Sequence, residues 1–262
     1  MSRVSAPIRL IEVSKTFTGQ RAPAIDRVNL EVAPNSFVAL VGGSGSGKTT
    51  LLKCINRLVE PDAGRVEIEG RPASDGAAWA LRRRIGYAFQ NVGLFPHLTV
   101  GENIAITPRL LGWEQTEIAA RVSELLALVN LPADYARRSP DALSGGERQR
   151  VGVARAIAAR PSIVLMDEPF GALDPITREA LGEAYRALHD KLGLTTVMVT
   201  HDVQEAVLLA DRIVVIRKGR IVADDTPRTL LAGHPDAEVA TLMAAPRRQA
   251  ERVQALIDRE RP

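Results

Sequence analysis

The sequence predicts an α/β fold in which helices cover a mostly parallel sheet, and two patterns lead to this prediction. In the second half of the 262-residue chain, short apolar runs typical of buried strands alternate with longer segments of helical periodicity. Such alternation favours parallel strands joined by crossover helices. Earlier in the chain, Phe37–Val41 is a continuous apolar run that ends in glycines, as expected for a strand buried on both faces.

The predicted elements follow in order from the N-terminus. Two β-like runs at 8–17 and 25–32 flank the turn-rich segment 18–23, and an alternating run at 65–69 ends at Gly70, so we expect a small antiparallel sheet here. Between about 98 and 131 the apolar period becomes helical, which predicts a helical insertion. Later strands are expected at 163–166, 195–200 and 213–216, and later helices at 177–192 and 203–209.

Composition and charge exclude several classes of protein. Hydrophobic residues make up 45% and charged residues 25%, as in ordinary globular proteins rather than disordered or collagen-like ones. The net charge of +3 comes from short basic clusters mixed with acids, so we expect no nucleic-acid partner. No apolar run approaches the ~20 residues that cross a bilayer, and no secretory signal is apparent. The single Cys54 can form no internal disulfide, and we therefore expect a cytoplasmic location.

A glycine-rich segment predicts a phosphate-binding loop (P-loop, residues 42–49). It fills the pattern G-x-x-x-x-G-K-[ST] between a buried strand and a helical stretch at 50–58. Glycines let backbone N–H groups face phosphate oxygens, Lys48 adds positive charge, and the Thr49 hydroxyl is suited to ligate Mg²⁺. The expected nucleotide-binding residues are Gly42, Gly43, Ser44, Gly45, Ser46, Gly47, Lys48, Thr49 and Thr50.

Two carboxylates follow the apolar run at 163–166. Asp167 stands where this strand emerges from the sheet, so we expect it to hold Mg²⁺, directly or through a water. Glu168 is the candidate base for the attacking water, because adjacent carboxylates can divide these roles. A merely solvated Asp-Glu-Pro loop is the alternative, which the neighbouring P-loop makes less favoured.

The run Leu143-Ser144-Gly145-Gly146-Glu147 predicts the start of a helix. Ser144 and Glu147 form a capping box, and the glycines leave the first N–H groups open to an anion. A purely structural cap does not explain two glycines in a first turn, where they lower helix propensity. The run, continued to Arg150, resembles the signature motif of the ATP-binding cassette (ABC) family.

Further residues match other motifs of this family in the family's order. The resemblance implies that Phe17 stacks on adenine, although it could instead be a core aromatic that closes a β-turn. It implies that Gln90 reaches Mg²⁺ and the lytic water, and that His201 is the switch histidine that contacts the γ-phosphate. Asp174 resembles the aspartate of the D-loop and is also placed to cap the helix that follows.

The resemblance covers roughly residues 8–225. It implies a P-loop NTPase fold, the ABC nucleotide-binding domain, with a RecA-like core, an antiparallel β subdomain and an α-helical subdomain. We expect this domain at 1–233, its helical subdomain at about 91–160, and a short C-terminal tail at 234–262. Family members pair head to tail, so we expect an ATPase that works as a homodimer, with the signature residues Ser144, Gly145 and Gly146 completing the partner's ATP site.

Several segments most resemble ATPases of bacterial osmoprotectant importers for glycine betaine, choline or carnitine: 83–87, 91–100, 102–104 and 170–178. The resemblance implies a peripheral protein on the cytoplasmic side of the inner membrane, bound to transmembrane permease subunits and, through them, to a substrate-binding protein. Importers of sulfate, polyamines or amino acids share parts of these segments and stay an alternative. A cassette that acts on ribosomes or nucleic acid is less favoured, because no second cassette, coiled coil or zinc insertion is visible.

Overall fold

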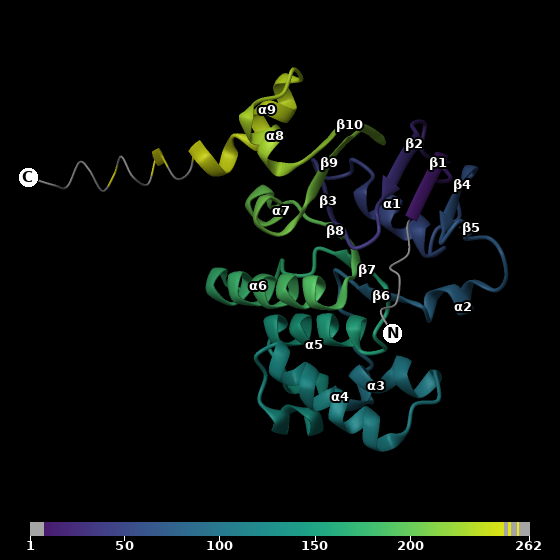
Figure 1. The fold of residues 1–262 in the computed structure, drawn as a ribbon, viewed down its shortest axis with the longest axis vertical. Coiled ribbons are helices and arrows are strands. Elements are labelled where there is room, and N and C mark those ends of the chain that lie inside the picture. Colours follow the sequence, from purple (N-terminus) through teal and green to yellow (C-terminus); the bar gives the residue numbers. More distant parts are fainter. Residues whose placement is uncertain (1–7, 249–250, 253–255, 257–262) are drawn as a thin grey trace, which may run out of the picture.

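Six strands form the central sheet, in the spatial order β10–β9–β3–β8–β7–β6 (Figure 1). Their bounds are β3 Phe37–Val41, β6 Ile85–Ala88, β7 Ile163–Asp167, β8 Thr195–Val199, β9 Arg212–Arg217 and β10 Arg220–Asp225. All neighbours are parallel except β9 and β10, which form an antiparallel hairpin. The computed structural model, which describes residues 8–248, 251–252 and 256, thus confirms the predicted α/β fold.

The second sheet is antiparallel and has the order β2–β1–β4–β5. Its strands are β1 Ile8–Lys15, β2 Ile25–Val32, β4 Ala63–Ile68 and β5 Arg71–Pro72. The predicted strands are confirmed, whereas β5, β6 and β10 were not expected. β5 has only two residues, too short for a period of two to be visible.

Helices pack against both faces of the central sheet. Figure 1 shows α3 and α4 stacked beyond α5 at one end of the molecule, and α8 and α9 beside β10 at the other. The bounds are α1 Lys48–Ile55, α2 Ala78–Arg82, α3 Val100–Leu110, α4 Gln115–Leu128, α5 Gly145–Ile157, α6 Pro175–Leu192, α7 Val203–Leu209, α8 Pro227–Ala232 and α9 Ala237–Met243. Two 3-10 turns occupy Ala133–Arg137 and Pro140–Ala142. The stretch predicted at 50–58 ends earlier, because Arg57 adopts a left-handed φ of 59°.

Two apolar cores hold these layers together. One lies between the central sheet and α3–α7, and the other lies between the two sheets around α1. Cys54 of α1 is fully buried in the second core, where burial raises the pKa of its thiol to about 11. The glycine-rich loop that leads into α1 is therefore anchored on a packed core.

The C-terminal segment begins with α9, whose Val239 and Met243 are buried against the first core. The rest of the expected tail lies mostly outside the described residues. Within the described part of the chain, no helix is long and apolar enough to span a membrane.

Candidate nucleotide-binding site

The P-loop connects the buried end of β3 to α1 and can curl only because of its glycines. Gly42 has a φ of 145°, and a Cβ there would lie 2.2 Å from the Ile216 carbonyl oxygen. Gly47 has a φ of 107°, and a Cβ there would lie 2.2 Å from the Ala24 carbonyl oxygen. Both positions therefore require glycine, and β9 and the start of β2 form the walls against which the loop packs.

The inner surface of the P-loop offers hydrogen-bond donors. Lys48 is buried, and its ammonium donates to the Gly42 oxygen at 2.8 Å and the Gly43 oxygen at 2.9 Å, which leaves its third N–H for an anion. Burial lowers the pKa of Lys48, while Glu168 and Asp167 act in the opposite direction. No side chain caps α1, so no side-chain oxygen competes for its first N–H groups.

One orphaned polar atom also fits a phosphate. Ser46 Oγ is buried and, among the described residues, has no hydrogen-bond partner. A buried hydroxyl without a partner is costly, and a phosphate oxygen in the loop would satisfy it. The donor set of the P-loop therefore suits the phosphates of a nucleotide.

Thr49 and Asp167 meet beneath the loop. Asp167 ends β7 in the core of the sheet, and its Oδ1 accepts a hydrogen bond from Thr49 Oγ1 at 2.8 Å. Burial raises the pKa of Asp167, and the bond from Thr49 opposes this effect. No group of three or more His, Cys, Asp or Glu in the described ranges could hold a metal alone. Oxygen ligands of this kind suit Mg²⁺ that also binds phosphates.

The three predicted catalytic residues converge. Glu168 Oε2 accepts a hydrogen bond from Gln90 Nε2 at 2.9 Å and lies 3.4 Å from His201 Nδ1. Each residue follows a neighbouring strand of the central sheet: Gln90 follows β6, Glu168 follows β7, and His201 follows β8. The carboxyl ends of parallel strands meet at one edge of a sheet, which explains the convergence of residues so distant in sequence.

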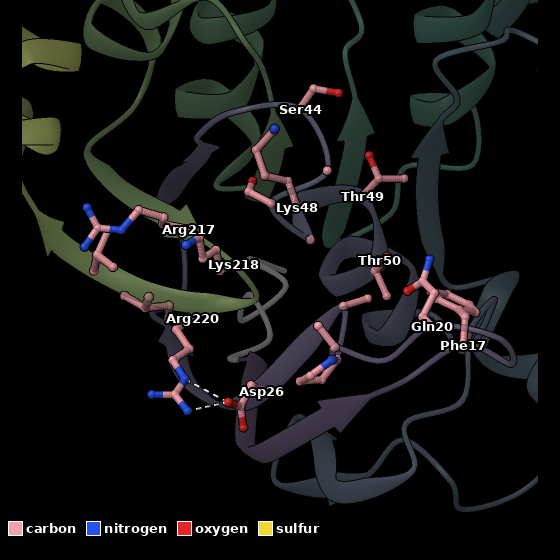
Figure 2. Close-up of a pocket in the computed structure, with 18 of the residues that line it drawn as sticks. Phe17, Gln20, Asp26, Ser44, Lys48, Thr49, Thr50, Arg217, Lys218 and Arg220 are labelled. Carbon is pink, nitrogen blue, oxygen red and sulfur yellow. Dashed lines mark hydrogen bonds and ion pairs between the residues drawn. The ribbon is translucent and has the colours of Figure 1, made fainter.

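A single open pocket of about 1470 Å³ joins these parts. It is lined by the P-loop from Ser44 onward, Thr50, Phe17, residues 20–24 and the three converging side chains. Phe17 lies at one side of the pocket in Figure 2, and the residue is 38% exposed. Lys15 Nζ lies 5.7 Å from the centroid of that ring and forms a 2.7 Å ion pair with Asp62.

The signature residues and Asp174 do not line this pocket. Ser144 caps α5 in the expected capping box: its Oγ accepts from Glu147 N at 3.2 Å, and its own N–H donates to Glu147 Oε2 at 2.7 Å. Hydrogen bonds from Tyr135 and Ser144 lower the pKa of Glu147 to about 2. Asp174 caps α6 by accepting from Thr177 N at 3.0 Å. Both expected caps are confirmed.

Several lining residues escaped the sequence-based prediction. Arg217, Lys218 and Arg220 of the β9–β10 hairpin lie across the pocket from Phe17, with Arg220 paired to Asp26 (Figure 2). A backbone bond of 2.9 Å from Gly219 N to the Ser46 oxygen ties this hairpin to the P-loop. A Lys-Gly turn after the predicted strand at 213–216 indicates a hairpin in the sequence. No local pattern shows that this hairpin contacts the P-loop.

A P-loop joined to a carboxylate, an amide and an imidazole is typical of an enzyme that hydrolyses nucleoside triphosphates. A comparison with protein families identifies the family. The family described as ABC transporter matches residues 25–171, more than half of the chain. The chain therefore belongs to the ABC transporter family.

The individual relatives are ATP-binding proteins of transport systems for small solutes. The choline transport ATP-binding protein OpuBA of Bacillus subtilis is 48% identical over 229 residues, covering 87% of this chain and 60% of that protein. The glycine betaine uptake system ATP-binding protein YehX of Escherichia coli is 48% identical over 224 residues, covering 86% of this chain and 72% of that protein. The sulfate/thiosulfate import ATP-binding protein CysA of Caulobacter vibrioides is 46% identical over 224 residues, covering 84% of this chain and 65% of that protein. The chain thus spans about 60% of the length of the first of these relatives.

Solved structures agree with the fold. A dimeric ATP-binding cassette in a post-hydrolysis state, bound to ADP and Pi, superposes with a TM-score of 0.79 at 33% identity, covering 84% of this chain and 98% of that one. A second dimeric structure, of a bacterial ABC transporter cassette, gives the same TM-score of 0.79 at 35% identity, with the same coverage of 84% and 98%. The fold is accordingly that of an ABC nucleotide-binding domain.

Proposed function

We propose that this chain binds ATP with Mg²⁺ and hydrolyses it as the nucleotide-binding subunit of an ABC importer. The observation that carries the proposal is the meeting of Gln90, Glu168 and His201 at the P-loop pocket, with Glu168 Oε2 2.9 Å from Gln90 and 3.4 Å from His201. A carboxylate, an amide and an imidazole in this arrangement can orient a water and accept its proton. Membership of the ABC transporter family supports the same activity.

The binding roles follow from the donors described above. The P-loop amides, Lys48 and Thr50 hold the phosphates, and the exposed face of Phe17 stacks on the adenine ring. Thr49, Asp167 and Gln90 would hold Mg²⁺, which supplies charge neutralisation at the phosphates. Burial of Asp167 makes its carboxylate a stronger ligand, because a cation compensates for the lost hydration.

The chemical roles fall to the converging residues. Glu168 accepts the proton of the attacking water, Gln90 orients that water through its amide, and His201 contacts the γ-phosphate. The negative charge that spreads over the phosphoryl oxygens is stabilised by donors already fixed in place, which is the main requirement for phosphoryl transfer.

Replacing the proposed base tests the ATPase assignment. Glu168→Gln keeps the shape of the side chain but removes the proton acceptor, so we expect kcat to fall by about 10² to 10⁴. ATP affinity, measured by titration calorimetry, should stay within about threefold. Glu179→Gln, which changes an exposed carboxylate on α6, is the matched control and should keep wild-type turnover. A Glu168→Gln enzyme within a factor of about three of wild type would contradict the role of Glu168.

The signature residues are proposed to act across a dimer. The first turn of α5 does not line the chain's own pocket, and a Cβ at Gly145 would meet nothing within 4 Å. Open N–H groups at this helix start suit the γ-phosphate held by a partner. Ser144, Gly145, Gly146 and Asp174 would therefore complete the ATP site of a second copy. We assign residues 1–233 to this ATP-binding domain and 234–262 to a C-terminal segment that begins with α9.

A groove next to Gln90 is the proposed contact for the permease. It has a volume of about 380 Å³ and is lined by Tyr87, Phe89, Asn91, Phe95 and Arg155, among others. Phe89 and Phe95 are 40% and 46% exposed, so the groove presents two aromatic side chains that a partner protein could cover. Because Gln90 adjoins both this groove and Glu168, a permease seated here would sense the nucleotide site.

The transported solute is proposed to be a quaternary ammonium osmoprotectant. The choline and glycine betaine relatives support this substrate, and the sulfate/thiosulfate relative favours the alternative of another solute. The chain would then work as a peripheral subunit on the cytoplasmic side of the inner membrane, where the permease provides selectivity and contacts the substrate-binding protein.

Uptake assays separate these substrates. Cells that lack the gene should lose uptake of labelled betaine or choline at high osmolarity and should recover it with the wild-type gene but not with Glu168→Gln. Loss of sulfate or amino-acid uptake with intact betaine and choline uptake would reject the osmoprotectant but keep the ATPase. Association with ribosomes or DNA without a transport defect would favour a non-transport cassette.

A further inference from the structure

The amide of Gln149 bridges two points of the loop that carries Glu168. Gln149 lies on α5, and its side-chain Nε2 donates to the Glu168 carbonyl oxygen at 2.8 Å. Its Oε1 accepts from the Ala172 N–H at 2.7 Å. The residue is only 4% exposed. The buried amide of Gln149 thus hydrogen-bonds, through both its nitrogen and its oxygen, to the loop between β7 and α6.

This loop needs support because its backbone is strained. Glu168 adopts a left-handed φ of 48°, which is unfavourable for a residue with a side chain. Two backbone bonds help to hold it, from Glu168 N to the Val199 oxygen at 2.9 Å and from Gly171 N to the Glu168 oxygen at 3.3 Å. The bond from Gln149 is shorter than the latter and shares its acceptor. Because φ sets the direction of the side chain, these bonds orient the Glu168 carboxylate.

A simple packing role does not explain a glutamine here. The other buried residues of α5 are apolar or glycine: Val151, Gly152, Val153, Ala154, Ala156 and Ile157. An amide is costly to bury unless its donors and acceptor are satisfied, so an aliphatic side chain would suit a purely structural position better. The stabilising partners of Gln149 are instead backbone atoms that bracket the proposed base.

We propose that Gln149 is a positioning residue that couples the start of α5 to Glu168 within the same chain. This inference rests on the proposed function, in which Ser144–Gly146 bind the partner's nucleotide and Glu168 acts on the chain's own. A shift of α5 on engaging the partner would move Gln149, which lies on the second turn of that helix. Through Gln149 it would move Glu168 and the loop leading to Asp174. Nucleotide at one site would thereby set the geometry of the base at the other.

Gln149→Met tests the coupling, because methionine has a similar length but cannot form either hydrogen bond. We expect kcat to fall by about 10- to 100-fold, since misplacing a catalytic group by about 1 Å has effects of this size. KM for ATP and the affinity for ATP should stay within about threefold. The Hill coefficient for ATP in steady-state turnover should fall towards one if the two sites act together in the wild type.

A double-mutant cycle shows whether the effect passes through the base. In the Glu168→Gln background, Gln149→Met should change the residual rate by less than about threefold, because the side chain that it positions has lost its function. Equal losses in both backgrounds would overturn the proposal. The control Arg121→Met removes a buried polar side chain of α4 that hydrogen-bonds to the opposite end of α5, and it should keep kcat within about threefold.

Gln149→Glu provides a second test if Gln149→Met does not fold. The new carboxyl can still accept from Ala172 N but donates to the Glu168 oxygen only when protonated. The activity of this variant relative to wild type should therefore rise as the pH is lowered from 8 to 6. A flat ratio with wild-type kcat would reject the coupling. Wild-type turnover in Glu168→Gln itself would instead reject the proposed base, so the two failures are distinguishable.

Discussion

Phe17 illustrates how one side chain of the site is prepared by its neighbours. Asp62 accepts from the Thr16 N–H at 2.7 Å and from Lys15 Nζ at 2.7 Å, so it fixes the backbone just before Phe17 and the cation near its ring. The hydrogen bond from Lys15 is the main reason that the pKa of Asp62 is lowered. The Lys15 ammonium thus lies near one part of the Phe17 ring, and the rest of the ring stays available to stack on a nucleotide base.

We expect Phe17→Ala to weaken ATP binding by about five- to 150-fold, because stacking on a base contributes roughly 1 to 3 kcal/mol. Equilibrium titration with ATP and with inorganic tripolyphosphate measures the effect. Only the ATP affinity should change, since tripolyphosphate has no base to stack. Trp79→Ala, which removes an exposed aromatic on α2 outside the pocket, is the control. An unchanged ATP affinity would make Phe17 a structural residue.

Glu205 predicts a dependence of stability on pH. Burial raises its pKa to about 7, whereas a hydrogen bond with Thr200 lowers it. A carboxyl whose pKa is higher in the folded state favours folding below its unfolded pKa of about 4.5, and this contribution is lost as the pH rises through about 7. Glu205→Gln should therefore gain stability relative to wild type on going from pH 5 to pH 8, by on the order of 1 to 3 kcal/mol. Urea denaturation at both pH values measures the difference, and a constant difference would contradict the shift.

The local part of the site was predictable from residues alone. The P-loop, Asp167 and the Ser144–Glu147 capping box depend on spacings of a few residues, and the sequence displays such spacings directly. Gln149 and Lys15 act through partners 19 to 47 residues away. No short pattern encodes these contacts, because they arise only when the sheets and α5 have packed.

At the scale of elements, Arg121 joins α4 to the end of α5. It is 4% exposed, and its guanidinium donates to the Ala158 oxygen at 3.1 Å and the Ile157 oxygen at 2.7 Å. These carbonyls lie at the C-terminal end of α5, where the Ile157 oxygen also accepts a 3.2 Å bond from the Arg160 N–H. A 2.9 Å ion pair with Glu124 completes the contacts. The sequence predicted the apolar stripe of this helix but not a buried arginine within it.

Arg121→Met should lower the free energy of unfolding by about 1 to 3 kcal/mol, because it removes two hydrogen bonds to carbonyl oxygens at the end of α5 while keeping most of the packing volume. Arg121→Lys, which restores the charge but not both bonds, should recover part of the loss. Chemical denaturation gives the values. A loss below about 0.5 kcal/mol would contradict a stabilising role for these two bonds.

At the scale of the whole molecule, the structure places the P-loop pocket and the start of α5 apart within one chain. Two copies, each offering its α5 to the pocket of the other, would complete both sites. We expect Glu168→Gln with ATP to give, in light scattering, a mass about twice the 28.3 kDa of one chain. Adding Ser144→Arg should restore the monomer, since a bulky cation at that position blocks the closed interface. A Glu168→Gln protein that stays monomeric with ATP would contradict this arrangement.

The burial of Cys54 has a practical consequence for labelling. It is the single cysteine of the chain, it is fully buried, and its thiol has a pKa of about 11. Because the thiolate is the reactive form, maleimide dyes should not label Cys54 at neutral pH. A cysteine introduced at one exposed position would then carry the only fluorophore, without first removing the native thiol. Paired dyes on two such copies would report the approach of the subunits in real time.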